Sequence, residues 1–138
     1  MGLLEIKDLK VHYPLKSGFL SSKKSLAAVD GISLSLEAGK NYGLVGESGS
    51  GKSTVGRAMV GLERITAGQI IYEGTDVTAA IARRKSDHKR NVQMIFQDSG
   101  ASLNPKKQIG QIISEPLHNF EQLSQQEEKK RVLELLEM

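Results

Sequence analysis

A glycine-rich loop followed by lysine and serine places the strictest demand on how this chain folds. Gly46 and Gly51 frame the loop, and Lys52 and Ser53 follow it directly. Such a loop curls tightly because glycine relieves the steric crowding that other residues impose on the backbone. A short apolar run at 41–45 precedes the loop, and apolar residues at helical spacing follow it. The order of strand, loop and helix predicts an α/β fold with a buried parallel strand.

The residue types in this loop suit the binding of phosphates. Glycines let successive backbone N–H groups point inward, and the start of the following helix adds its positive dipole end. Lys52 can reach the β- and γ-phosphates as a point charge, and the Ser53 hydroxyl can ligate Mg²⁺. The pattern predicts binding of ATP with Mg²⁺, and the alternative is a glycine-rich turn with an unrelated lysine. The predicted nucleotide-binding residues of the loop are Gly46, Glu47, Ser48, Gly49, Ser50, Gly51, Lys52, Ser53 and Thr54.

Residues 1–37 have the pattern of a small antiparallel β unit. The expected segments are a half-buried strand over 4–11 that Pro14 ends, an exposed loop over 16–24, and strands over 25–29 and 32–36. We expect a hairpin turn between the last two strands at Asp30 and Gly31, because glycine takes positive φ readily.

Residues 38–105 are expected to form the P-loop core. Apolar runs next to glycine predict buried strands, and a polar, basic stretch predicts an exposed helix. The expected elements are a strand at 41–45, a helix at 54–62, a strand at 69–72, a helix at 78–90 and a strand at 92–96.

Residues 106–138 change to helical spacing. The apolar positions of the first helix are Ile109, Ile112, Ile113 and Leu117. Ser124 and Glu127 form a capping-box pattern at the start of a second helix. No glycine or proline ends that helix before Met138. We therefore expect 106–138 to be the start of a helical subdomain, and the chain to be a fragment of a longer protein.

Composition favours a cytoplasmic protein. The sequence has no cysteine, which suits a reducing compartment and excludes disulfides and cysteine metal sites. No apolar run has the length of a membrane span, which is about 18 residues or more. Any association with a membrane is therefore expected to occur through a partner.

The basic residues leave two interpretations open. The chain has 19 Lys and Arg against 16 Asp and Glu, a net charge of +3, with short basic clusters. Nucleic-acid binding is one reading of such clusters, and solvated surface is the other. Each cluster is short and aromatic residues make up only 4% of the chain, so we expect solvated faces and no nucleic-acid partner.

Three segments together resemble the ATP-binding subunit of an ABC transporter. They are LVGESGSGKST at 44–54, QMIFQD at 93–98 and ASLNP at 101–105. The resemblance runs through the whole chain, and the ASLNP segment is the most specific for the oligopeptide/dipeptide importer branch. The resemblance implies a partial ABC-type P-loop core with the antiparallel β unit and the start of the helical subdomain.

The resemblance also implies roles for two residues outside the loop. Gln97 matches the Q-loop glutamine, which contacts Mg²⁺ or the attacking water and relays nucleotide state to the membrane partner. Its alternative is a surface residue at a strand end. Tyr13 lies where the family places an aromatic ring that stacks on adenine, and its alternative is a tyrosine packed at a strand end. The implied Mg²⁺ ligands are Ser53 and Gln97.

Other parts of the family pattern have no match. The signature Leu-Ser-Gly-Gly-Gln, an apolar run ending in Asp-Glu and a later switch histidine are not found. We interpret His12, His88 and His118 as structural or solvated. Because the catalytic carboxylate is not matched, we expect this chain to bind ATP without hydrolysing it.

The function implied by the resemblance is ATP hydrolysis that powers import of peptides or a related small solute. The implied partners are transmembrane permease subunits, a second ATP-binding subunit and, indirectly, a substrate-binding protein. The implied location is peripheral, at the cytoplasmic face of the membrane. Two alternatives stay open: another P-loop enzyme, either a GTPase or a small-molecule kinase, and a non-enzymatic nucleic-acid-binding module. The guanine-reading pattern Asn-Lys-x-Asp is not found.

Overall fold

The computed structural model describes residues 2–15, 25–83, 87–121 and 123–138. The chain divides into two compact units, a first unit of 1–94 and a second unit of 95–138, and each is described by itself. The loop expected at 16–24 lies outside the described residues. None of the described helices is both long and apolar enough to cross a membrane.

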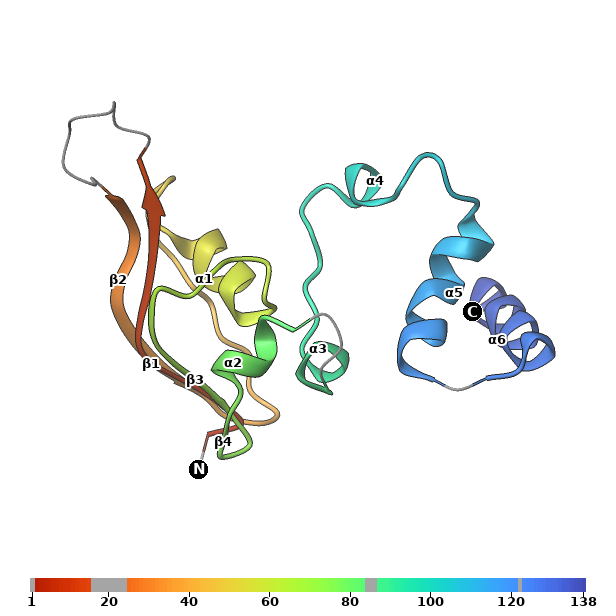
Figure 1. Ribbon diagram of the computed structural model, residues 1–138, viewed down its shortest axis with the longest axis horizontal. Helices are drawn as coiled ribbons and strands as arrows, with labels where there is room; N and C mark the ends of the chain where they lie inside the picture. The colour runs from red at the N-terminus through yellow and green to blue at the C-terminus, as the bar shows by residue number, and fades with distance from the viewer. Residues whose placement is uncertain (1, 16–24, 84–86, 122) are drawn as a thin grey trace. The chain divides into compact units, whose positions relative to one another are not determined.

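The first unit contains an antiparallel sheet (Figure 1). Its strands are β1 (Leu4–Pro14), β2 (Ser25–Leu36), β3 (Ala67–Tyr72) and β4 (Thr75–Asp76), in the order β2-β1-β3-β4. Every neighbouring pair is antiparallel. The strands predicted at 4–11 and 69–72 are confirmed as β1 and β3. The buried residues of β1 are Leu4, Ile6, Leu9 and Val11.

The alternation of β1 shifts by one residue at Asp8, where the backbone bulges. Asp8 has a φ of 47°, and its neighbours Gly31 on β2 and Gly68 on β3 have φ values of 80° and 91°. The pairing register shifts at this point with both strands. A Cβ on Gly68 would collide with the carbonyl oxygen of Asp8, and one on Gly31 would lie 2.9 Å from its Oδ1. The glycines therefore let both neighbouring strands pass an irregular β1.

The hairpin predicted at Asp30 and Gly31 is wrong, because β2 is one continuous strand. Residues on both sides of the proposed turn pair with β1, with Val29 opposite Val11 and Ile32 opposite Leu9. Gly31 does take a positive φ. That φ accommodates the bulge at Asp8 and does not reverse the chain.

Helix α1 (Lys52–Met59) packs on the sheet and confirms the helix predicted at 54–62, although it ends earlier. Its residues Val55 and Ala58 are buried in the same core as the strands. Gly61 follows with a φ of 74°. A Cβ there would collide with the carbonyl oxygen of Ile81, so glycine allows the chain to turn close to the next helix.

The single exposed helix predicted at 78–90 is wrong. The structure has two short helices, α2 (Thr78–Ile81) and α3 (Asp87–Asn91), and residues 82–83 are not helical. Ile81 and His88 are both buried. His88 Nε2 lies 2.7 Å from the carbonyl oxygen of Met59. Each of the two short helices thus has a buried residue, whereas the polar sequence pattern alone predicted one solvated helix.

The buried strands predicted at 41–45 and 92–96 do not form in the described structure. Val45 is 90% exposed and Ile95 is 94% exposed. A parallel strand needs a neighbour that completes its hydrogen-bond ladder. No described strand pairs with either segment, and Val92 alone of these two runs packs against the core of the first unit.

The second unit is helical among its described residues. It contains α4 (Ser99–Ser102), which was not predicted, and the predicted pair α5 (Ile109–Phe120) and α6 (Gln125–Glu137). The capping box at the start of α6 is confirmed. Ser124 N–H donates to Glu127 Oε2 at 2.9 Å, and Glu127 N–H donates to Ser124 Oγ at 3.4 Å.

Candidate nucleotide-binding site

The glycine-rich loop leads directly into α1 in the first unit. Ser50 N–H donates to the carbonyl oxygen of Glu47 at 3.2 Å, which closes a turn within the loop. Gly49 and Gly51 have φ values of 81° and 88°, which other residues adopt only with strain. A Cβ on Gly51 would also collide with the carbonyl oxygen of Ala28 on β2. Glycine at 51 is thus required for its backbone conformation and for close packing against the sheet.

Lys52 is the first residue of α1, and its side chain folds back over the loop. Its Nζ lies 2.8 Å from the carbonyl oxygen of Gly46, 2.6 Å from that of Glu47, and 3.2 Å from Ser50 Oγ. An ammonium group has three N–H donors, and these contacts use all of them. The loop is therefore wrapped around one positive charge at the place where phosphates are expected.

The start of α1 supplies the second element of an anion site. Gly51 precedes the helix and has no side chain to cap it, and Val55 N–H donates to the Gly51 carbonyl oxygen at 2.9 Å. The positive dipole end of a helix and its first N–H groups stabilise a phosphate. Ser53 and Thr54 lie in this first turn, and the side chain of Ser53 is exposed and accessible to a metal ion.

A pocket of about 370 Å³ lies between the loop and β2. Its lining combines residues 28–30 and 32 from β2 with loop residues 44–46 and 50–52. Asp30 in this lining pairs with Lys10, whose Nζ lies 3.6 Å from Asp30 Oδ1. Residues 47–49 also belong to the predicted nucleotide-binding residues, and they are exposed at the tip of the loop.

Tyr13 lies near the end of β1, opposite Leu26 of β2. The pKa of Tyr13 is raised above its usual 10.0, and the neighbouring Glu63 carboxylate is the main cause. The ring is partly buried against the core. The contact of Tyr13 with adenine stays a prediction.

Glu63 is a residue that sequence reasoning missed. It lies in the segment after α1, and it raises the pKa of Tyr13, which lies on the first strand. No local pattern links two positions so far apart in the chain. Only the folded chain brings them together.

Gln97 belongs to the second unit, where its side chain is exposed. Its contact with Mg²⁺ or water stays a prediction. Among the described residues, no group of three or more His, Asp or Glu side chains could hold a metal ion. His88 is buried, and His118 Nδ1 lies 4.0 Å from Glu128 Oε2, as expected of structural and solvated histidines.

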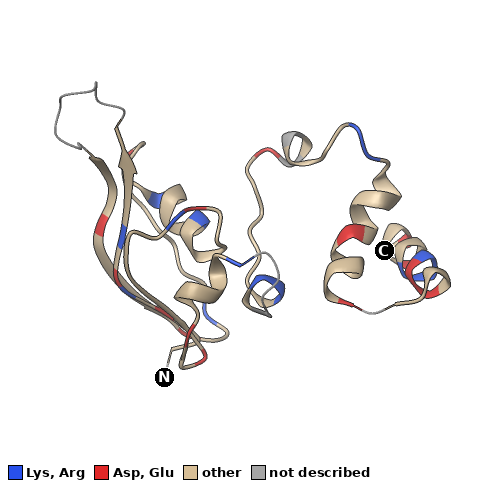
Figure 2. Cartoon of the chain, viewed as in Figure 1, with Lys and Arg blue, Asp and Glu red and all other residues tan. Residues whose placement is uncertain are grey.

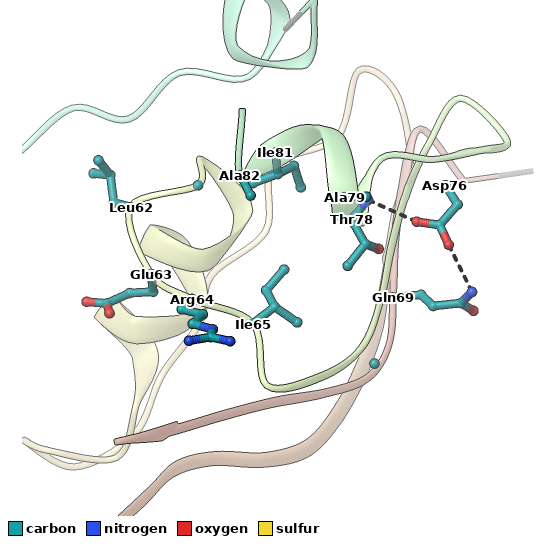
Figure 3. Close-up of a pocket in the computed structure, with 12 residues that line it drawn as sticks. Leu62, Glu63, Arg64, Ile65, Gln69, Asp76, Thr78, Ala79, Ile81 and Ala82 are labelled. Atoms are coloured by element: carbon teal, nitrogen blue, oxygen red, sulfur yellow. Dashed lines mark hydrogen bonds between the residues drawn. The ribbon is translucent and has the colours of Figure 1, made fainter. Parts of the chain in front are cut away.

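A larger pocket of about 890 Å³ is lined by residues 61–65, β3 and α2 (Figure 3). Its polar side chains bind one another. Gln69 Nε2 donates to Asp76 Oδ2 at 2.9 Å, and Thr78 N–H donates to Asp76 Oδ1 at 2.9 Å. The bonds from Thr78 and Gln69 lower the pKa of Asp76. A carboxylate kept ionised in this way would repel a phosphate, so the glycine-rich loop is the better candidate.

Among the described residues, acidic residues lie between the basic ones along the chain, as Figure 2 shows. Several basic side chains pair with acids, among them Lys107 with Glu115 at 2.6 Å and Arg131 with Glu134 at 3.1 Å. This distribution favours solvated surface over a nucleic-acid interface.

A glycine loop wrapped around a lysine at the start of a helix defines a P-loop nucleotide-binding protein. Within that class, the family model described as "ABC transporter" matches residues 29–138. The chain belongs to the ABC transporter family. The match supports this reading over the GTPase, kinase and nucleic-acid alternatives.

Curated relatives are similar over nearly the whole chain but are much longer. The oligopeptide transport ATP-binding protein OppF of Lactococcus lactis is 50% identical over 99% of this chain and 43% of its own length. The OppF protein of Salmonella typhimurium is 47% identical over 94% of this chain and 40% of its own. The dipeptide transport ATP-binding protein DppF of Escherichia coli is 39% identical over 97% and 40%. The chain therefore spans less than half the length of these relatives.

A solved structure supports the fold. The ATP-binding cassette MJ0796, described as a dimer in a post-hydrolysis state bound to ADP and Pi, superposes with a TM-score of 0.68. It is 23% identical, and the similarity covers 97% of this chain and 56% of that one. The fold expectation of a partial ABC-type α/β core is confirmed at this level.

Proposed function

We propose that this chain binds ATP with Mg²⁺ through the glycine-rich loop and the start of α1. The observation that carries the proposal is the Lys52 ammonium group, which the loop surrounds at 2.6 to 3.2 Å. Anionic phosphate oxygens can replace these neutral oxygens and accept charge-assisted hydrogen bonds from the ammonium group. Ser53 would ligate the metal ion from the first turn of α1, with Gln97 as a second ligand.

The complete protein would couple ATP hydrolysis to the import of peptides or a related small solute. Relatives with printed roles in oligopeptide and dipeptide transport support this proposal. It would act with transmembrane permease subunits, a second ATP-binding subunit and, indirectly, a substrate-binding protein. Its place would be at the cytoplasmic face of the membrane. Residues 1–37, 38–105 and 106–138 would be the β unit, the P-loop core and the start of the helical subdomain.

The phosphate role of Lys52 is tested by calorimetric titration of the chain with Mg²⁺ and ATP. Lys52→Ala should weaken binding about ten- to hundredfold, since a charge-assisted contact contributes about 1.5–3 kcal/mol. Lys40→Ala is the matched control, because Lys40 is an exposed lysine that pairs with Glu37 outside the loop. Equal affinity of the Lys52 variant and the control would refute the proposed site.

The coupling role of Gln97 is tested in the complete transporter. Gln97→Ala should leave ATP binding in place while solute-stimulated hydrolysis falls, because the residue is assigned to metal geometry and relay. Intact stimulation in that variant would contradict the assignment.

A further inference from the structure

His88 is a buried side chain that the proposed nucleotide site does not use. It lies on α3 and is 4% exposed, and among the residues that the structure describes it is the one polar side chain that is buried. Burying an imidazole is unfavourable unless its nitrogen atoms find hydrogen-bonding partners. The contacts of its two nitrogen atoms therefore indicate what this residue does.

The Nε2 atom of His88 is bonded to the last residue of α1. It lies 2.7 Å from the carbonyl oxygen of Met59. A carbonyl oxygen can only accept a hydrogen bond, so Nε2 carries a proton and donates it. Nδ1 is also buried and has no hydrogen-bonding partner within the described part of the chain. A proton on Nδ1 would be a buried donor without an acceptor, so the contacts fit the tautomer whose proton is on Nε2.

This bond completes the hydrogen bonding at the C-terminal end of α1. The last carbonyl oxygens of a helix have no partner within the helix. Those of the two residues before Met59 accept from the backbone N–H groups of Gly61 at 3.1 Å and Leu62 at 2.8 Å. The Met59 carbonyl oxygen accepts from His88 instead. The imidazole thus does for Met59 what the following backbone does for the two residues before it.

His88 is itself held in place within the first unit. Its ring meets the ring of Tyr72 on β3 edge to face, with centroids 5.6 Å apart and an angle of 79° between the planes. Aromatic rings favour this arrangement. The His88 carbonyl oxygen accepts from Val92 N–H at 2.8 Å, and Val92 packs against the core. The bond to Met59 therefore connects α1 to a side chain that α3 and β3 both hold.

The N-terminal end of the same helix carries the proposed phosphate-binding residues. α1 has eight residues, and only two of them are buried, so packing alone restrains it little. Gly51 lies close against β2 just before the helix, and His88 fixes the other end. Hydrogen bonds join each turn of a short helix to the next, so the helix moves as one body. A displacement at Met59 would therefore also displace Lys52 and Ser53.

We propose that His88 positions α1, and with it Lys52 and Ser53, for phosphate binding through its bond to Met59. The inference rests on the proposed function and gives a role in it to a residue that lies at the opposite end of α1 from the loop. His88 is a positioning residue, because it acts on the phosphates only through the helix.

Two variants of His88 separate its hydrogen bond from the packing of its ring. His88→Phe keeps a ring against Tyr72 but has no donor, whereas His88→Gln keeps an N–H donor near the position of Nε2. Calorimetry measures the affinity of the chain for ATP and for inorganic triphosphate, each with Mg²⁺. His88→Phe should weaken the binding of both by the same factor of about two to ten, the value of one ordinary hydrogen bond. His88→Gln should restore most of this loss.

The matched control for these variants is His118→Phe, because the side chain of His118 is 82% exposed and lies on α5 in the second unit. The control should bind both ligands as the unsubstituted chain does. Equal losses in His88→Phe and His88→Gln would overturn the proposed role, since the ring and not its N–H group would then be what matters.

NMR of the ligand-free chain gives readouts that a merely local loss of stability would not produce. The ring nitrogen signals of His88 should show the proton on Nε2. This tautomer is read in the unsubstituted chain, so it tests the role even if a variant fails to fold. The backbone amide signals of Lys52 and Ser53 should move in His88→Phe and return in His88→Gln. A proton on Nδ1, or unmoved signals at these two residues, would overturn the positioning role.

Failure of the His88 role and failure of the proposed site give different results. Unchanged affinity in His88→Phe, beside a loss in Lys52→Ala, would overturn the role of His88 and leave the site in place. If the unsubstituted chain binds neither ligand, the proposed function fails, and the positioning role fails with it.

Discussion

Gly51 performs two functions that no other residue type can combine. Its φ of 88° lies in the left-handed region, and its missing Cβ leaves room for the carbonyl oxygen of Ala28. The first property lets the loop turn into α1. The second lets β2 support the loop from behind, so the loop and the sheet edge form one structure.

Gly51→Ala should therefore abolish most nucleotide binding while the sheet stays folded. A left-handed alanine costs about 1–2 kcal/mol, and the collision with Ala28 must displace either the loop or β2. We expect the affinity for Mg²⁺ and ATP to fall more than tenfold. Calorimetry measures the loss, and circular dichroism checks the fold.

Gly49→Ala is the control for Gly51→Ala. Gly49 has a similar φ of 81°, but a Cβ there would have no neighbour within 4 Å. This variant should show only the cost of backbone strain. If both variants lose the same amount of affinity for Mg²⁺ and ATP, the close packing of Gly51 against Ala28 contributes nothing to nucleotide binding.

At the scale of helices and strands, the sequence predicts well the features that neighbouring residues determine. The alternation in β1, the apolar spacing of α5 and the capping box of α6 are properties of neighbouring residues, and each is confirmed. The glycine-rich loop is local too. Its lysine lies at the first position of α1, as the pattern requires.

Elements that depend on distant partners were predicted less well. Gly31 signals a positive φ, but only pairing with β1 decides between a turn and a bulge. The run at 41–45 has strand composition without a described strand to pair with. The effect of Glu63 on the pKa of Tyr13 depends on the folded chain, which no spacing within the sequence reveals.

The start of α6 should depend on the ionisation of Glu127. Bonds from the Ser124 hydroxyl and backbone N–H lower the pKa of Glu127 below its usual 4.5. The ionised carboxylate of Glu127 therefore stabilises the folded state at pH values above its usual pKa. This stabilisation is lost as the pH falls through the lowered pKa. Amide exchange in the first turn of α6 should therefore accelerate at acidic pH.

Ser124→Ala tests this element directly. The variant should show fast exchange in the first turn of α6 at neutral pH, with little further change on acidification. Gln126→Ala is a suitable control, because Gln126 lies in the same turn and has no part in the capping box. Identical exchange in the two variants would mean that the capping box does not hold this turn.

At the scale of the whole molecule, binding and turnover should be separable. The chain spans 43% of the length of the Lactococcus lactis relative. Phosphoryl transfer to water requires a positioned nucleophile as well as neutralised phosphate charge, and the loop supplies only charge. Neither Glu47 nor Asp98 lies where the resemblance places the catalytic carboxylate.

We therefore expect the purified chain to bind ATP without steady-state release of phosphate. A sensitive phosphate assay checks this, with Lys52→Ala as the control for contaminating ATPases. Turnover that Lys52→Ala abolishes would show that a catalytic carboxylate is present in the chain after all.

The bulge at Asp8 also restricts how this sheet can change during evolution. Gly31 and Gly68 flank Asp8 from both sides, so three strands share one reference point. An insertion or deletion within any one strand would move its residue away from that point. A glycine would then face an ordinary strand residue, and a residue with a side chain would face the bulge at Asp8. Changes of length in this sheet should therefore be confined to its connections, and substitutions at these three positions should occur together.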